Sequence, residues 1–236
     1  MNTVERVIKA ANKFYMKLRE DPNARFRSWE YCYKCFHDAR KNYPEADYDY
    51  LSLQLAFYLA SWGMYRGSSF LLQKDYKIHK PVVEELLKPR YDCLFGIECK
   101  ELKNKEIQNK LEDLESFMNE YYDKIRKNVK STEIKSKLST TLITKILMGT
   151  LGCVPAYDRY YIDGVKALKI TTGNYNKESL LRLVDFYEKN RKSFEVAKIN
   201  MNVYGLPYPQ MKLLDMALWE IGFEKDNNEK KKLLGN

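Results

Sequence analysis

The chain has 236 residues and a mass of 28.0 kDa, which suits one domain or two small lobes sharing a cleft. Hydrophobic residues make up 44%, which excludes a disordered chain, and no stretch approaches the roughly 20 apolar residues that span a bilayer. Five cysteines without an N-terminal export signal predict reduced thiols in a cytoplasmic protein, and the net charge of +9 favours an anionic partner.

Apolar side chains recur at helical spacing along nearly the whole chain, so the sequence predicts an all-α, multi-helix fold. The single exception is a short strand expected at residues 169–172. The expected helices cover residues 3–19, 28–41, 47–62, 81–88, 104–129, 142–151, 157–168, 176–187 and 211–221.

These helices are expected to form one domain over residues 1–226, with lobes at 1–100 and 101–226 flanking a cleft as an alternative. Residues 227–236 contain a run of three lysines and are expected to fray. The apolar stripe of residues 104–129 packs either on the chain's own core or on a helix of another protein. The second alternative predicts a protein-interaction module.

Positive charge is concentrated in residues 122–170, which hold ten basic and four acidic side chains. This segment therefore carries six of the nine net positive charges in about a fifth of the chain. A local excess of this size attracts phosphate groups over a Debye length. It favours a polyanion such as nucleic acid as the partner. No membrane partner is expected, because no long apolar stretch is present.

The cysteines and histidines suggest a metal site only weakly. Cys32 and Cys35 have zinc-ligand spacing, but they lie in a helical pattern, whereas structural zinc pairs usually lie on tight turns. Buried thiols are the preferred interpretation, so we expect no metal and no cofactor. The chain contains no P-loop, no G-x-G-x-x-G and no H-E-x-x-H, which argues against the nucleotide-hydrolase, dehydrogenase and zinc-protease classes that carry them.

Two segments combine residue types that are unusual for a plain helix. Residues 61–69 contain a large aromatic ring, a cation, two glycines and three hydroxyls. They predict either a close helix contact at the glycines or a cavity wall where Trp62 or Tyr65 stacks on a base and Arg66 meets a phosphate.

Residues 142–161 place an apolar helix before a Gly-Cys-Val-Pro-Ala turn, and Asp158 follows at the next helix start. Asp158 is either a helix cap or a catalytic acid.

The second segment resembles the catalytic segment of the helix-hairpin-helix DNA glycosylases over residues 135–165, in which a turn ends in Val-Pro and is followed by Asp, Arg and an aromatic residue. The resemblance implies an all-α, two-lobed fold that bends DNA and flips a base into the cleft between the lobes. It also implies that Asp158 is the catalytic aspartate. The glycine-rich hairpin of that family is replaced here by residues 135–141, which contain no glycine, so hydroxyls and lysines would contact the phosphate. Ser139 stands near the position of the lysine nucleophile of bifunctional members, which implies a monofunctional enzyme.

The resulting hypothesis is an Asp158-dependent hydrolase that removes a modified or damaged base from DNA, in genome repair or against foreign DNA. The alternatives are a non-catalytic helical protein that binds DNA or RNA, and the protein-interaction module. Tyr157 and Tyr161 would contact the substrate, although core packing is an equally valid expectation for tyrosines that point in different directions. The expected substrate and DNA contacts are Trp62, Tyr65, Arg66, Lys137, Ser139, Thr140, Lys145, Tyr157, Arg159 and Tyr161.

Overall fold

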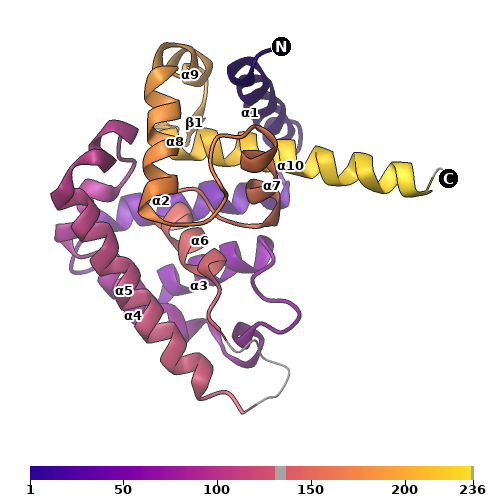
Figure 1. The fold of residues 1–236 in the computed structure, drawn as a ribbon. Coiled ribbons are helices and arrows are strands. Elements are labelled where there is room, and N and C mark those ends of the chain that lie inside the picture. Colours follow the sequence, from indigo (N-terminus) through magenta and orange to yellow (C-terminus); the bar gives the residue numbers. More distant parts are fainter. Residues whose placement is uncertain (131–136, 235–236) are drawn as a thin grey trace.

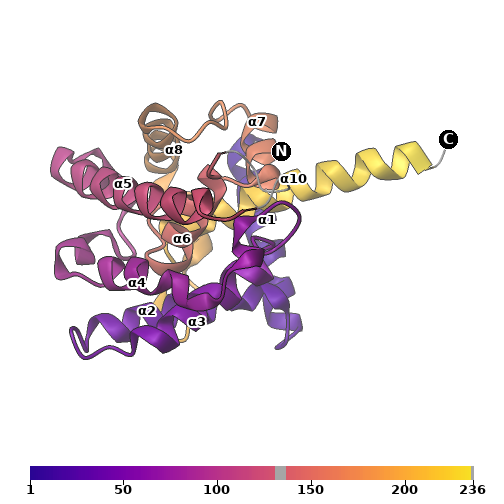
Figure 2. The same ribbon diagram turned by 90° about the horizontal axis from the view of Figure 1, so that it is seen from below.

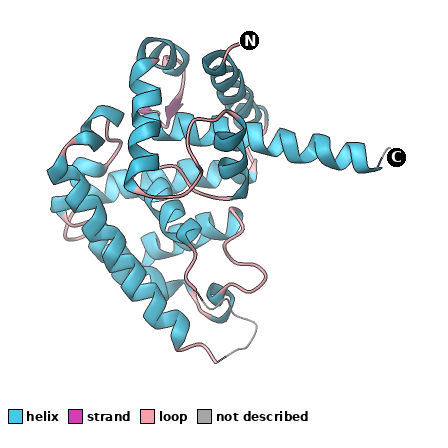
Figure 3. Ribbon diagram, in the orientation of Figure 1, coloured by secondary structure: helices cyan, strands magenta, loops and turns pink. Residues whose placement is uncertain are grey.

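Helices account for almost all of the regular structure in the computed structural model, which describes residues 1–130 and 137–234. The predicted all-α, multi-helix fold class is confirmed (Figure 3). The helices are α1 (Thr3–Glu20), α2 (Ser28–Arg40), α3 (Tyr48–Ser61), α4 (Lys80–Leu86), α5 (Lys105–Lys127), α6 (Thr140–Thr150), α7 (Arg159–Ala167), α8 (Lys177–Lys189), α9 (Arg191–Lys198) and α10 (Gln210–Leu234). Short 3-10 turns occur at Arg25–Arg27, Phe70–Gln73, Tyr76–His79, Pro89–Leu94 and Cys99–Lys103.

The strand predicted at residues 169–172 is wrong. The backbone N–H of Ile170 donates back to the carbonyl of Val165, and Lys169 takes a positive φ of 55°, so this segment ends α7 as a turn. In the described ranges a two-stranded antiparallel ladder forms elsewhere, between β1 (Asn202–Val203) and β2 (Leu206–Pro207). Helix α9 was not predicted, and Phe194 is its buried residue. A helix of only eight residues with a single buried apolar side chain is shorter than the window over which apolar periodicity predicts a helix.

Side-chain caps define where several helices begin. Asn2 and Glu5 form a reciprocal capping box at α1, while Asp47, Asn104 and Asn176 accept hydrogen bonds from the first turns of α3, α5 and α8. These caps satisfy backbone N–H groups that have no partner within the helix. The helix boundaries therefore follow closely from local sequence.

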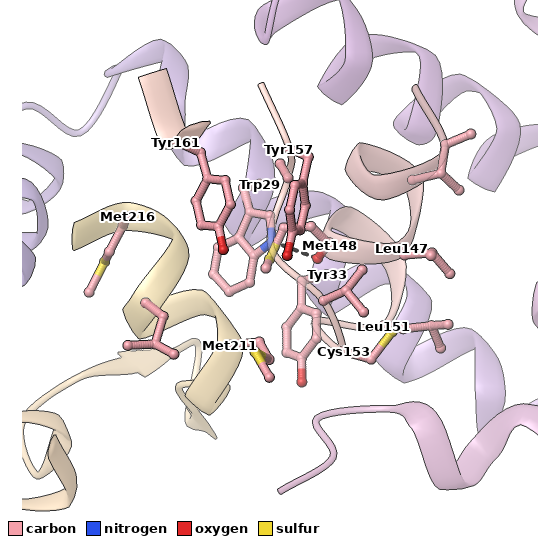
Figure 4. Packing of buried hydrophobic residues seen from close by; sticks show 14 of the residues in the cluster. Trp29, Tyr33, Leu147, Met148, Leu151, Cys153, Tyr157, Tyr161, Met211 and Met216 are labelled. Atoms are coloured by element: carbon pink, nitrogen blue, oxygen red, sulfur yellow. Dashed lines mark hydrogen bonds between the residues drawn. The ribbon is translucent and has the colours of Figure 1, made fainter. Parts of the chain in front are cut away.

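One hydrophobic core runs through the molecule from Val7 to Ile221, and residues of both ranges 1–100 and 101–226 contribute to it. Figure 4 shows part of this core, where the indole N–H of Trp29 on α2 donates to the carbonyl of Met148 on α6 at 2.9 Å. The two ranges that were considered as lobes therefore share a single core. No helix in the described ranges combines the length and the apolar content needed to cross a bilayer.

Helices α7 and α10 approach each other unusually closely. A Cβ atom on Gly164 would lie 1.9 Å from the carbonyl oxygen of Leu218, and one on Gly222 would lie 1.9 Å from that of Tyr160. Only glycine allows backbones to meet at this separation. The distal end of α10 projects from the body in both views (Figures 1 and 2). It continues to Leu234, through residues that were expected to fray. An i,i+4 ion pair between Asp226 and Lys230 supports this extension.

Candidate functional site

A cavity of about 820 Å³ opens where the two unusual sequence segments meet. Residues 61–70 form one side, α6 and the residues before it form a second, and the start of α7 with Trp219 and Phe223 of α10 forms a third. Within the described ranges, Asp158 is the one acidic residue of the lining. The basic residues of the lining are Arg25, Arg66, Arg126, Lys137, Lys145 and Arg159. The cavity is therefore electropositive around a single carboxylate.

Aromatic rings form one continuous wall of this cavity. Phe26 packs against Trp62 with ring centroids 4.9 Å apart, and Trp62 meets Trp219 edge-on at 6.1 Å. Trp219 stacks on Phe223 at 5.0 Å and 13° and contacts Tyr160 edge-on at 5.2 Å. A wall of this kind offers flat apolar surface on which a planar ring can stack.

Asp158 lies at the N-terminus of α7 and serves as its cap. Its Oδ1 accepts the backbone N–H of Tyr161 at 3.1 Å, and its Oδ2 lies 3.3 Å from Nζ of Lys145. The side chain is 15% exposed and reaches the cavity. The cap interpretation of Asp158 is therefore confirmed, and the same carboxylate also faces the cavity.

Lys145 is almost completely enclosed, with 5% of its side chain exposed. Its Nζ donates to the carbonyl oxygen of Trp62 at 2.7 Å and lies 5.7 Å from the centroid of the Trp62 ring. Burial lowers the pKa of Lys145, because the charged form loses hydration, while the negative charge of Asp158 opposes that effect. The two groups stabilise each other's charge at the edge of the cavity.

Three hydrogen bonds from two helices fix the turn that carries Asp158. Thr144 Oγ1 accepts the N–H of Tyr157 at 3.0 Å, and Thr141 Oγ1 donates to the carbonyl of Tyr157 at 2.9 Å. The N–H of Ala156 donates to the buried carboxylate of Asp215 at 2.8 Å. Helices α6 and α10 together therefore hold the backbone on which Asp158 stands.

A second buried ion pair lies behind the aromatic wall. Lys212 and Asp215 on α10 are paired at 2.7 Å with only 2% and 5% of their side chains exposed. The ammonium group of Lys212 lies 4.8 Å from the ring centroid of Trp29 and 5.1 Å from that of Trp62. Lys212 was not among the predicted site residues. Charges at i,i+3 within the apolar run of residues 211–219 were the available signal.

The structure brings most of the predicted site residues together. Trp62, Arg66, Lys137, Ser139, Lys145, Asp158 and Arg159 all line the cavity. Ser139 also caps α6, since its hydroxyl accepts the N–H of Thr141 at 3.2 Å. Lys135 and Ser136 of the hairpin-like stretch lie outside the described residues.

Four predicted contacts lie away from the lining. Tyr157 and Tyr161 are 2% and 0% exposed and belong to the core, as their alternative interpretation proposed (Figure 4). The hydroxyl of Tyr65 is hydrogen-bonded to buried His79 at 2.7 Å, and Thr140 is exposed at the start of α6. Conversely, Arg25, Phe26, Arg126, Trp219 and Phe223 line the cavity without having been predicted, because their positions depend on how distant segments pack.

Comparison of the chain with family models, curated proteins and solved structures finds no match. Among the side chains that the structure describes, no group of three or more His, Cys, Asp or Glu is placed to hold a metal ion. Cys32 and Cys99 are buried, and burial raises the pKa of both thiols.

Proposed function

We propose that this protein binds DNA across the basic mouth of the cavity, takes one extruded nucleotide into it, and cleaves the N-glycosidic bond of that nucleotide. The observation that carries the proposal is the position of Asp158, a carboxylate that faces an aromatic cavity and is surrounded by basic side chains. The resemblance over residues 135–165 assigns the catalytic role to this same residue.

The aromatic wall and the basic rim have separate tasks. Basic side chains such as Arg25 and Lys137 neutralise backbone phosphates around the mouth and offset the cost of bending the duplex. An extruded base loses its stacking partners in the duplex, and Trp62 or Trp219 replaces them. A modified base that pairs poorly is extruded at the lowest cost, which supports selectivity for damaged or altered bases.

Asp158 supplies the charge that the reaction requires. As the bond from the sugar to the base breaks, positive charge develops on the sugar ring, and a nearby carboxylate stabilises it or orients the attacking water. Lys145 holds one oxygen of this carboxylate and the α7 backbone holds the other. The carboxylate therefore keeps a fixed orientation and needs little reorganisation during the reaction.

The experiment is incubation of the protein with duplex DNA carrying a panel of modified bases, followed by alkali to cleave at abasic sites. We expect strand cleavage for at least one modified base, with Asp158→Asn losing at least a hundredfold in rate while binding DNA no more weakly. Asp163→Asn is the matched control, because Asp163 lies on the same helix but outside the cavity lining. Failure on the whole panel, or full activity of Asp158→Asn, contradicts the proposal.

A second candidate is a non-catalytic nucleic-acid-binding protein, and the partners of Asp158 favour it. Both carboxylate oxygens already have a partner, Tyr161 N–H for one and Lys145 for the other, as expected of a purely structural acid. This candidate predicts salt-sensitive DNA binding without release of any base. The same incubation distinguishes the two candidates.

A further inference from the structure

Two cations converge on the turn that follows α3. The ammonium group of Lys145 donates to the carbonyl oxygen of Trp62 at 2.7 Å. The guanidinium of Arg66 folds back over Gly63, the residue after Trp62. A Cβ on Gly63 would lie 3.2 Å from Cζ of Arg66. Gly63 has a φ of 76°, which glycine adopts readily. The turn thus brings a buried lysine and an accessible arginine to one corner of the cavity.

Positive charge exceeds negative charge in this corner. Asp158 offsets one cation through its 3.3 Å contact with Lys145. No carboxylate of the described residues forms an ion pair with Arg66, whose charge contributes to the lowered pKa of Lys145. Two like charges held together favour the entry of an anion, because it relieves their repulsion.

We propose that Arg66 and Lys145 form a subsite for the phosphoryl group of a nucleotide. The subsite rests on the proposed function, since it receives a phosphate of the same nucleotide whose base stacks on the aromatic wall. Arginine binds phosphate oxygens through a planar pair of N–H groups, and lysine supplies a compact charge. Trp62 borders both the corner and the aromatic wall, so a ligand that joins a flat ring to a phosphate fits both features.

The first experiment compares free ligands by calorimetry, using 2′-deoxyadenosine 5′-monophosphate, 2′-deoxyadenosine and inorganic phosphate. We expect the monophosphate to bind at least tenfold more tightly than the nucleoside, and Arg66→Gln to abolish this difference. Gly63→Ala provides a second variant, because its methyl group would displace the Arg66 guanidinium. Arg182→Gln is the control, since Arg182 is an exposed cation of α8 outside the cavity.

The second experiment tests whether the phosphate belongs to DNA. A neutral methylphosphonate replaces the phosphate on the 5′ side of a modified nucleotide in duplex DNA. We expect this replacement to weaken binding to the unaltered protein at least fivefold and to leave Arg66→Gln unchanged. If only the methylphosphonate weakens binding, the bound phosphate belongs to DNA. If only the free monophosphate shows Arg66-dependent binding, the phosphate belongs to a free nucleotide. Absence of both effects overturns the subsite.

The test of the phosphate subsite can fail independently of the test of glycosidic cleavage, because neither binding experiment requires base release. Arg66-dependent phosphate binding without any abasic product supports the subsite and contradicts glycosidic cleavage. Base release that is indifferent to Arg66 and to the methylphosphonate supports cleavage and overturns the subsite.

Discussion

The backbone N–H of Ala156 donates to the buried carboxylate of Asp215 across 2.8 Å, two residues before Asp158. This bond connects the turn that carries the candidate catalytic residue to the second turn of α10. The other oxygen of Asp215 is paired with Lys212, whose ammonium group contacts the Trp62 ring. One buried ion pair therefore supports both the acid and the aromatic wall of the cavity.

Removing one member of this pair is expected to be strongly destabilising. Asp215→Leu leaves the charge of Lys212 buried without a partner and the N–H of Ala156 without an acceptor, which lowers the free energy of unfolding by roughly 3–5 kcal/mol. Urea denaturation measures this loss. Glu178→Ala, which breaks an exposed ion pair on α8, is expected to cost less than about 1 kcal/mol.

The double variant Lys212→Met/Asp215→Leu tests whether the cost comes from the uncompensated charge. It is expected to be more stable than Asp215→Leu alone, because no charge remains buried. A double variant as unstable as the single one contradicts this explanation.

The contact between α7 and α10 predicts an asymmetry among glycine substitutions. Gly164→Ala would place a methyl group 1.9 Å from the Leu218 carbonyl, so it forces the helices apart and costs about 3 kcal/mol or more. A Cβ on Gly67 would meet no atom of the described residues within 4 Å, so Gly67→Ala costs about 1 kcal/mol, because of its positive φ of 54°. Thermal unfolding of the two variants compares these costs, and similar melting temperatures refute the close-packing argument.

The pH dependence of stability should report on His79. Burial lowers the pKa of His79 to about 3, and both ring nitrogens are hydrogen-bonded, to Tyr65 and Tyr122. Between pH 7 and pH 5 the unfolded chain takes up a proton at this histidine while the folded protein does not, so acidification destabilises the fold by up to about 2 kcal/mol. In His79→Gln, the free energy of unfolding measured in urea should no longer fall by this amount between pH 7 and pH 5. If it still falls by the same amount, other groups cause the loss.

DNA binding through the cavity mouth predicts a specific salt dependence. Arg25 is an exposed lining residue, so Arg25→Gln should remove about one phosphate contact. The slope of the logarithm of the DNA association constant against the logarithm of the salt concentration should then become less steep by about 0.9. Arg182→Gln on α8 should leave the slope unchanged. Equal slopes for all three proteins place the DNA elsewhere.

Much of the fold followed from local sequence, because apolar periodicity and capping residues act within one or two helical turns. The apolar stripes predicted helices at residues 3–19 and 104–129, and the structure confirms both as α1 and α5, with Asn2 and Asn104 as their caps. The strand at 169–172 was wrong since a return hydrogen bond to Val165 decides that segment. Short apolar runs do not distinguish a strand from a helix end.

The site divides in a similar way. Asp158, Trp62, Arg66 and Lys145 belong to segments whose composition was already unusual, and the structure places them in one cavity. Trp219 and Phe26 could not be associated with them, because their proximity arises from packing between segments far apart in the chain. Tyr161 was ambiguous for the reason that a tyrosine suits a core and a binding surface equally.

The glycine contact between α7 and α10 also determines which parts of the cavity can adapt. Asp158 stands at the start of α7, and Trp219 and Phe223 lie on α10, so the acid and this part of the aromatic wall belong to two helices in backbone contact. The distance between Asp158 and these aromatic rings is therefore fixed. The two helix backbones cannot move closer, and the core that they share resists their separation. A bulkier ligand therefore has to be accommodated by lining residues outside this helix pair, and the loop of residues 63–69 is one place to engineer ligand size.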